Sequence, residues 1–519
     1  MSSRILQWLS LVGIIWLQSI NGTNSNFPAY SSQLKQLLSI SQVQLNNLAF
    51  ASDAGKLFGC FAGIASIYLP LWLVLIIGST LGLIGYGVQY LFLTNQISSL
   101  SYGHIFLLTV IAGNSICWIN TVCYVIAIRN FPSNRQIVVG LTTSYVGLSA
   151  KIYTDIVDAK FSSSPTERAK AYLLLNSILP VIICVIASPL ARVVDVKNSR
   201  NMGVGFITMF VITIATGVYA VFSSLEFMSS KLSSMSNAIG IFVFLLAPLV
   251  IPVVEKIMEV VRKLNIKTEM KVYDFTIEDN EGAERMESGV KEREEASEEV
   301  HEVGAKEEIG VKVMLTRLDF WLYFFVYFFG ATLGLVFLNN LGQIVESRGH
   351  SGTSTLVSLS SSFGFFGRLM PSLMDYFFSR TKHMISRPAT IIALMAPTAG
   401  ALFLLTNSAD LSLHISSAII GVCSGAITSV AVSTTTDLFG TKNFSVNHNV
   451  VVANIPIGSF LFGYLAACLY NKEGNGHGKC MGMDCYKYTF IIWGSLCILG
   501  TFLAIVLYAR TRKFYRQKV

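Results

Sequence analysis

The sequence has little charge for its length. Only 13% of its 519 residues are Asp, Glu, Lys or Arg, 52% are hydrophobic, and the mean hydropathy is +0.57. Soluble proteins carry about 25% charged residues. A water-soluble chain of this length could not bury so much apolar surface. The composition excludes a soluble cytosolic enzyme, a disordered scaffold and a nucleic-acid binder, and it indicates a polytopic membrane protein.

The sequence also lacks motifs that would indicate catalysis or a bound metal. It has no HExxH sequence, no nucleophile elbow and no Walker sequence, and the glycine-rich stretch 474–479 is followed by Cys480 instead of Ser or Thr. Of the nine cysteines, Cys480 and Cys485 share a loop. We expect a disulfide there, because the predicted topology puts this loop outside. We predict no enzymatic activity, no cofactor and no metal site.

The charge that is present is distributed unevenly. Residues 255–319 hold 11 basic and 18 acidic side chains, whereas the formal net charge of the whole chain is +8. The other residues hold 27 basic and 12 acidic side chains, scattered at the ends of apolar stretches as in membrane proteins. Residues 263–316 are nearly free of aromatic residues, so we predict a solvated linker that is at most partly helical. A plain tether and a regulatory segment both fit this composition.

Fourteen stretches are long and apolar enough to span a membrane. They are 5–28, 45–66, 71–93, 104–128, 137–158, 171–191, 204–225, 237–258, 318–340, 354–377, 388–406, 413–435, 449–470 and 488–509. With both termini inside, the short inside segments carry 15 Lys and Arg residues and the outside segments 9, as the positive-inside rule favours. We predict a multi-pass protein of the plasma membrane or an endomembrane, with cytoplasmic N- and C-termini. The first stretch also permits a signal-peptide interpretation, although no clear cleavage site follows it.

The acidic linker separates eight predicted spans from six, which suggests two six-helix halves and an inserted helix pair. Lys56 lies 51 residues after Ile5, and Arg368 lies 50 residues after Leu318, each within a Gly-basic-Leu triplet. Parallel six-helix repeats are typical of the major facilitator fold. We therefore predict an all-α membrane protein with this fold and about 14 transmembrane helices. Its predicted domains are a first half at 5–191, an inserted pair at 204–258, an acidic cytoplasmic linker at 259–317 and a second half at 318–510.

Several short stretches in both halves carry a family resemblance. They include Ala51-Ser52-Asp53-Ala54-Gly55-Lys56, Arg129-Asn130-Phe131-Pro132, Asn339-Asn340-Leu341-Gly342-Gln343, Phe365-Phe366-Gly367-Arg368-Leu369 and Val446-Asn447-His448-Asn449, with others at 22–24, 29–32, 41–46 and 454–459. These stretches resemble the plant nodulin-like major facilitator proteins, and within them the nuclear-fusion-defective group. The resemblance implies a membrane transport fold but no established substrate. The chain departs from the family at 143–145, where relatives often have Lys-Gly-Tyr, so a substrate contact through that lysine would not be shared.

Two acid–base pairs lie within predicted spans, where ionisable residues are expensive and usually paired or functional. Asp53 and Lys56 are three residues apart, so they share a helix face. They form either a self-neutralising pair that helps insertion or a substrate or proton site. Lys151 and Asp155 are four residues apart and nearer the predicted outer end. An interfacial pair is favoured there over a site.

Other polar residues are candidates for binding a substrate. Arg368 has no acidic residue within one helical turn, so it either binds an anion or forms a structural contact between the halves. Amides gather at the ends of the first helix of each half, where they either orient a polar substrate or bond between helices. These amides are Asn21, Asn24 and Asn26 in the first half and Asn339 and Asn340 in the second. On the fourth span, Asn114, Asn120 and Tyr124 are further candidates for lining the same cavity.

A charged cluster is predicted at the cytoplasmic end of the second half. Asp375, Arg380 and Arg387 lie around and after the end of the span that contains Arg368, and Asp437 follows a later span. They form either a gate that closes the cytoplasmic side or a solvated loop that sets topology.

These observations lead to two hypotheses about function. The first is a secondary active transporter of a small polar or anionic solute, with Asp53 as a candidate for proton coupling; its partners would be that solute, protons and the lipid bilayer, and no nucleic acid. The second is a non-transporting receptor or an organiser of membrane or nuclear fusion, which the resemblance keeps open. Solute flux would distinguish the two.

Overall fold

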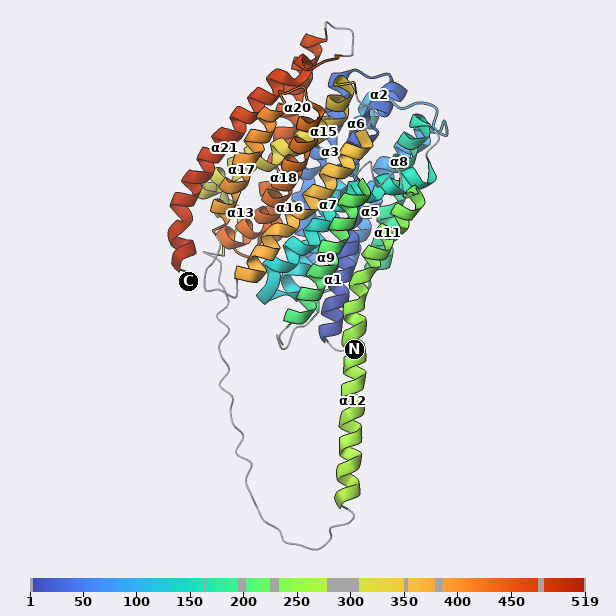
Figure 1. Cartoon of the computed structure of the whole chain (residues 1–519), viewed down its shortest axis with the longest axis vertical. Helices are drawn as coiled ribbons and strands as arrows, with labels where there is room; N and C mark the ends of the chain where they lie inside the picture. Colours follow the sequence, from blue (N-terminus) through green and yellow to red (C-terminus); the bar gives the residue numbers. More distant parts are fainter. Residues whose placement is uncertain are drawn as a thin grey trace.

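The computed structural model describes residues 3–161, 164–194, 202–224, 233–277, 308–349, 353–378, 386–474 and 480–517. Every regular element within these residues is a helix, and they contain no strand. The helices run along one long axis and form an elongated bundle (Figure 1). The expectation of an all-α protein is confirmed for the described part of the chain.

The predicted first half forms eight helices. They are α1 (Ser3–Ile20), α2 (Ser31–Leu38), α3 (Gln42–Ala54), α4 (Gly59–Tyr68), α5 (Leu71–Leu93), α6 (Tyr102–Asn130), α7 (Arg135–Lys160) and α8 (Pro165–Ala187). Helix α3 begins at a capping box, in which Ser41 and Gln44 satisfy each other's backbone N–H groups. A 3₁₀ turn at Gly55–Phe58 joins α3 to α4, so the second predicted span is an interrupted helix. Lys56 lies in this interruption.

The rest of the chain forms the inserted helices and the second half. The helices are α9 (Gly203–Ser224), α11 (Ser234–Leu246), α12 (Val250–Ile277), α13 (Val311–Thr316), α14 (Leu318–Tyr327), α15 (Leu333–Ser347), α16 (Thr353–Phe378), α17 (Arg387–Leu404), α18 (Asp410–Phe439), α19 (Phe444–Val452), α20 (Asn454–Glu473) and α21 (Asp484–Gln517). A π-helical turn, Phe328–Thr332, joins α14 to α15. The predicted linker begins inside α12, which projects beyond the bundle (Figure 1), and residues 278–307 lie outside the described part.

Eleven helices, counted over the described residues, are long and apolar enough to cross a membrane. Each matches one of the fourteen predicted spans. The other three predicted spans correspond to α1, α7 and α16, which carry buried polar residues, among them Gln18, Lys151 and Ser360. The count of fourteen therefore stays a prediction.

The first span is shorter than predicted, because α1 ends at Ile20 and the chain then turns at Gly22, where a Cβ atom would lie 2.7 Å from that of Ser149.

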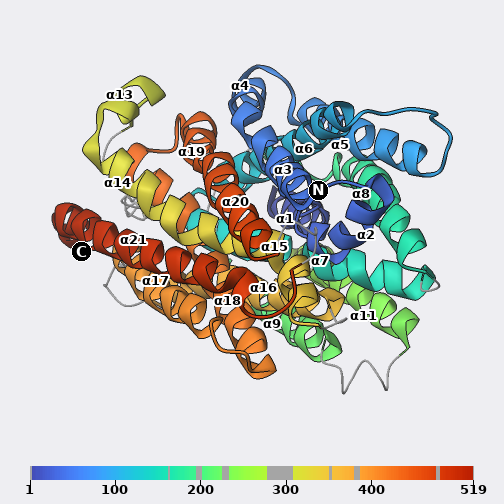
Figure 2. The same cartoon turned by 90° about the horizontal axis from the view of Figure 1, so that it is seen from above.

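The two halves meet along two helix pairs, α7 with α16 and α3 with α20. Helix α7 approaches α16 so closely that a Cβ atom on Gly147 would lie 2.6 Å from the backbone nitrogen of Phe365. Figure 2 shows the first half and the second half side by side, with α9 and α11 beside the line along which they meet. The inserted pair therefore packs against both halves, α9 on α16 and α11 on α7.

The two ends of the bundle differ. Both chain termini and the projecting α12 lie at one end (Figure 1), which we call the terminal end. The end of α20 and the start of α21 lie at the other end, where a disulfide joins Cys480 to Cys485 in the first turn of α21. We call it the disulfide end. These names distinguish the contacts that hold the halves together at each end.

Candidate functional site

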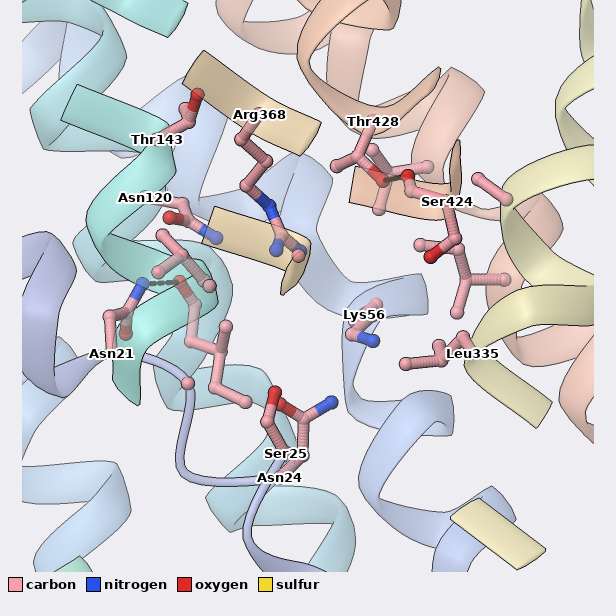
Figure 3. Close-up of a pocket in the computed structure, with 18 of the residues that line it drawn as sticks. Asn21, Asn24, Ser25, Lys56, Asn120, Thr143, Leu335, Arg368, Ser424 and Thr428 are labelled. Carbon is pink, nitrogen blue, oxygen red and sulfur yellow. Dashed lines mark hydrogen bonds between the residues drawn. The ribbon is translucent and has the colours of Figure 1, made fainter. Parts of the chain in front are cut away.

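A cavity of about 170 Å³ lies between the two halves. Its wall is built from the chain that follows α1 (residues 21–28), the 3₁₀ turn Gly55–Phe58, α6 and α7 of the first half, and from α15, α16, α18 and α19 of the second (Figure 3). Many of its lining residues are polar or charged. These include Asn21, Asn24, Ser25, Lys56, Asn120, Thr121, Tyr124, Thr143, Tyr327, Ser360, Ser361, Arg368, Ser424, Thr428, Ser445, His448 and Asn449.

Arg368 extends from α16 into this cavity (Figure 3). Its guanidinium passes α7 at Gly147, where a Cβ atom would lie 2.9 Å from Arg368 Nη1. The groups that interact with its charge are the phenols of Tyr124 and Tyr327, and no carboxylate of the described residues pairs with it. A cation inside a membrane bundle without a counter-ion is costly. An arginine in this position can pair with an anionic group.

Lys56 contributes a second cationic group to the cavity, but this group is paired. Its Nζ lies 2.5 Å from Asp53 Oδ1. The other carboxylate oxygen, Asp53 Oδ2, accepts hydrogen bonds from Asn339 Nδ2 at 3.2 Å and Ser459 Oγ at 2.6 Å. Asp53 is 1% exposed and does not line the cavity. Because its partners lie on α15 and α20, it joins the first half to the second, and we call this group of four residues the Asp53 latch.

The predicted asparagines divide into two groups. Asn21 and Asn24 line the cavity, and Asn21 also donates to the carbonyl oxygen of Ile116 at 3.1 Å. Asn26, Asn339 and Asn340 do not line it. Asn340 instead accepts a hydrogen bond at 3.0 Å from Asn46, so it joins the halves beside the Asp53 latch.

A buried charged cluster lies at the terminal end. Arg387 Nη1 is 2.6 Å from Asp375 Oδ1, and Arg387 Nε is 3.6 Å from Asp437 Oδ2. Gln136 of α7 bridges the cluster, because it accepts from Arg387 Nη2 and donates to Asp437 Oδ1 at 3.1 Å. We call these four residues the Arg387 latch. Arg380, predicted as a further member, lies outside the described residues.

Several functional candidates were not singled out as site residues from the sequence. The ring of His448 stacks on Phe444 with centroids 5.1 Å apart and meets Tyr124 edge-on at 5.6 Å, which forms an aromatic wall of the cavity. Ser424 and Thr428, four residues apart on α18, add hydroxyl groups. In the sequence, the four-residue spacing of Ser424 and Thr428, which places both on one helix face, could have indicated a polar surface. Asn114, predicted alongside Asn120 and Tyr124, does not line the cavity.

Comparisons with known proteins give the family. A model of the "Nodulin-like" family matches residues 7–253, and a model described as "NFD4, C-terminal domain" matches residues 302–517. Protein NUCLEAR FUSION DEFECTIVE 4 of Arabidopsis thaliana is 38% identical over 548 residues, which cover 100% of this chain and 91% of the relative. The chain belongs to the nodulin-like, nuclear-fusion-defective family. The resemblance seen in the sequence is confirmed.

More distant similarities concern this family's fold. A crystal structure of a mutant of the peptide transporter POT matches 98% of the chain and 95% of its own length, with a TM-score of 0.53 and 11% identity. This likeness confirms the major facilitator fold for the nodulin-like chain. A protein of Emericella nidulans named "Probable transporter mch1" is 24% identical over 238 residues, or 38% of this chain and 37% of that protein.

Proposed function

We propose that this nodulin-like protein is a secondary active transporter, not an enzyme, and that it moves a small anionic solute by alternating access. The observation that carries the proposal is Arg368, a cation without an acidic partner among the described residues, inside a cavity that both halves line. Arginine binds carboxylate and phosphate groups through two parallel hydrogen bonds. The name of the fungal relative and the fold shared with POT support a transport role.

The polar wall around Arg368 suggests how the rest of the solute is held. Asn21, Asn24 and Asn120 offer amide groups, and Ser424 and Thr428 offer hydroxyl groups (Figure 3). Amides and hydroxyls both donate and accept, so they suit a solute with hydroxyl or carbonyl groups besides its charge. The aromatic wall formed by His448, Phe444 and Tyr124 would pack against an apolar part of the solute.

The two latches support alternating access. The Asp53 latch ties α3 to α15 and α20 beside the cavity, which Lys56 lines, and the Arg387 latch joins the halves at the terminal end. Rocking of the halves requires one latch to open while the other stays closed. Protonation of Asp53 would weaken its hold on Lys56, Asn339 and Ser459 together, which makes Asp53 the candidate for proton coupling. Cytoplasmic termini would place the Arg387 latch on the cytoplasmic side of the plasma membrane or of an endomembrane.

Uptake into proteoliposomes tests the proposal. Vesicles containing the full chain are incubated with a mixture of organic acids, phosphorylated metabolites, amino acids and neutral sugars, and their contents are quantified by mass spectrometry. We expect accumulation of one class of anion, reduced at least tenfold in Arg368→Ala. Arg510→Ala, an exposed arginine whose partner is Asp319 at 2.6 Å, is the matched control and should leave uptake unchanged. Uptake of neutral solutes alone, or equal uptake by Arg368→Ala, would contradict the proposal.

The name of the Arabidopsis relative supports a second candidate, a receptor or organiser acting in membrane or nuclear fusion. On this alternative the cavity would bind a ligand without releasing it across the membrane. Ligand binding by the purified protein, together with the absence of any flux in the same preparation, would favour the alternative.

A further inference from the structure

A second cavity, of about 80 Å³, lies apart from the central one. It forms where α9 and α11 pack against α7 and α16, and every described residue that lines it carries a polar side chain. Figure 2 shows these four helices next to one another, with α9 and α11 at the edge of the bundle. A wholly polar pocket inside a membrane bundle is unusual, because buried polar groups need partners.

Two carboxylates face this pocket, and each is paired through one oxygen. Lys151 Nζ lies 2.5 Å from Asp155 Oδ1, and Arg168 Nη2 lies 2.5 Å from Asp158 Oδ1. The two pairs together carry no net charge. Asp155 is 5% exposed, and its second oxygen, Oδ2, has no hydrogen-bond partner among the described residues.

A second buried acceptor in the same pocket is also unpartnered within the described part of the chain. Asn237 of α11 is 6% exposed, and its Oδ1 accepts no hydrogen bond. Asp155 and Asn237 lie on different helices that meet at the pocket, so two independent elements present oxygen atoms without donors. A ligand that satisfies these oxygen atoms must accept electron density from several of them at once.

Two serine hydroxyls of α9 also present acceptor atoms to the pocket. Ser223 and Ser224 donate their protons to the carbonyl oxygen of Ala220, at 3.3 Å and 2.7 Å. Their Oγ atoms therefore present lone pairs to the pocket. An anion would meet the unpaired Asp155 oxygen and be repelled. A cation would be bound by carboxylate, amide and hydroxyl oxygens, the ligands that hard cations prefer.

We propose that this pocket binds a monovalent metal cation through Asp155, Asn237 and the hydroxyl oxygens of Ser223 and Ser224. A divalent ion fits less well, because the two carboxylates are already neutralised by Lys151 and Arg168. Asp155 lies five residues before the end of α7, about 7.5 Å along the helix. The site is therefore near the disulfide end, within reach of the solution on that side.

The proposed cation site shares a wall with the central cavity. On α7, Ala150 lines the central cavity and Lys151 the second pocket; on α16, Val357 and Ser358 divide in the same way. Cation binding would fix the packing of α7 on α16 and thereby the shape of the central cavity. This coupling to transport rests on the proposed function, whereas cation binding itself does not.

Thermal unfolding of the purified full chain in detergent tests the cation site without any solute. Tm is measured in rising NaCl or KCl, with choline chloride keeping the ionic strength constant. We expect a saturable rise in Tm with at least one of the two metal salts, and at least a tenfold weaker response in Asp155→Asn and Asn237→Ala. The variant Asn237→Ala leaves the Lys151–Asp155 pair intact, so it decides the result if Asp155→Asn does not fold. Asp484→Asn, an exposed carboxylate at the disulfide end, should behave like the wild type.

Two results would overturn the cation site. One is a Tm that does not respond to either metal salt, which means that the pocket holds water only. The other is an equal response in wild type, Asp155→Asn and Asn237→Ala. Failure of the proposed function is distinguishable, because the response of Tm to the salts would then persist while no uptake is seen with wild type.

Discussion

The two latches contain similar residues but depend on the two halves in different ways. In the Arg387 latch the charges, Asp375, Arg387 and Asp437, all lie in the second half, and one neutral residue, Gln136, ties them to the first. In the Asp53 latch both charges lie in the first half, and the neutral residues Asn339 and Ser459 tie them to the second. In each latch, ion pairs lie within one half and hydrogen bonds join the halves.

This difference indicates which contacts have to break in a transport cycle. An ion pair within one half moves as a unit and stays satisfied when the halves separate. A neutral hydrogen bond to a charged group contributes less, about 1.5–3 kcal/mol, and can be exchanged for water. The latches differ in one further respect: Lys56 faces the cavity, whereas Arg387 is 3% exposed and does not line it.

The largest effect is expected from Arg387→Ala. The substitution removes the Arg387 charge from the buried Asp437 and the partly buried Asp375, and breaking a buried ion pair in this way destabilises a protein by about 3–5 kcal/mol. Arg510→Ala is the matched control: its ion pair has the same 2.6 Å distance, but the arginine is 45% exposed, so its loss costs about 0–1 kcal/mol. Thermal unfolding in detergent measures both. Equal losses in the free energy of unfolding would mean that burial does not increase the contribution of the Arg387 latch to stability.

A smaller effect is expected from Asp53→Asn. The side chain keeps its size and can still accept from Ser459, and water in the cavity can solvate Lys56. We expect a loss of about 2–3 kcal/mol, in the range for hydrogen bonds to charged groups, and uptake that no longer depends on a proton gradient. Unfolding and pH-jump uptake measure the two parts. Wild-type proton dependence in this variant would remove Asp53 from the coupling.

Ser459→Ala sharpens the comparison further. It removes the 2.6 Å hydrogen bond across the halves to Asp53, and we expect a loss of about 1.5 kcal/mol. Ser144→Ala is the control, because that buried hydroxyl donates at 2.6 Å to a carbonyl of its own helix. If both substitutions lower the free energy of unfolding equally, the hydrogen bond between the halves contributes no more than one within a single helix.

The smallest effect concerns Glu308, beside the Arg387 latch. Burial alone would raise the pKa of this carboxyl, but the backbone N–H groups of Thr441 and Lys442 hold its pKa below the ordinary 4.5. The contact therefore stabilises the protein above that pH, and its contribution is lost as the pH falls through the folded pKa. Hydrogen exchange of residues 439–444 should be slower in wild type than in Glu308→Gln at pH 7, and the difference should shrink as the pH falls below 4.5. A difference that does not change with pH would contradict this.

The sequence predicted the helices well where hydrophobicity alone decides. Every predicted span overlaps helices of the structure, although several spans cover two helices joined by a short turn, because a long apolar run can satisfy its backbone in a bilayer in few other ways. The spacing of Asp53 and Lys56, and of Lys151 and Asp155, also predicted pairs that the structure contains. Both results follow from local geometry, a helix face that repeats every three to four residues.

Contacts between distant parts of the chain could not be predicted in this way. Ser459 meets Asp53 across 406 residues, and Gln136 meets Arg387 across 251. Both are neutral residues on apolar helices, without a local pattern that marks them. The placement of Asn339 on Asp53, and not in the cavity, likewise depends on how α15 packs against α3. Such contacts are set by the packing of the halves.

The most direct test of alternating access measures two distances in the same molecule. Spin labels on non-canonical amino acids, chosen because seven cysteines are free, are placed across the halves at each end. Double electron–electron resonance then compares wild type, Asp53→Asn and Gln136→Ala. We predict that Asp53→Asn lengthens the distance at the disulfide end and shortens it at the terminal end, and that Gln136→Ala does the reverse. Distances that stay unchanged at both ends, or lengthen at both ends together, would contradict the account.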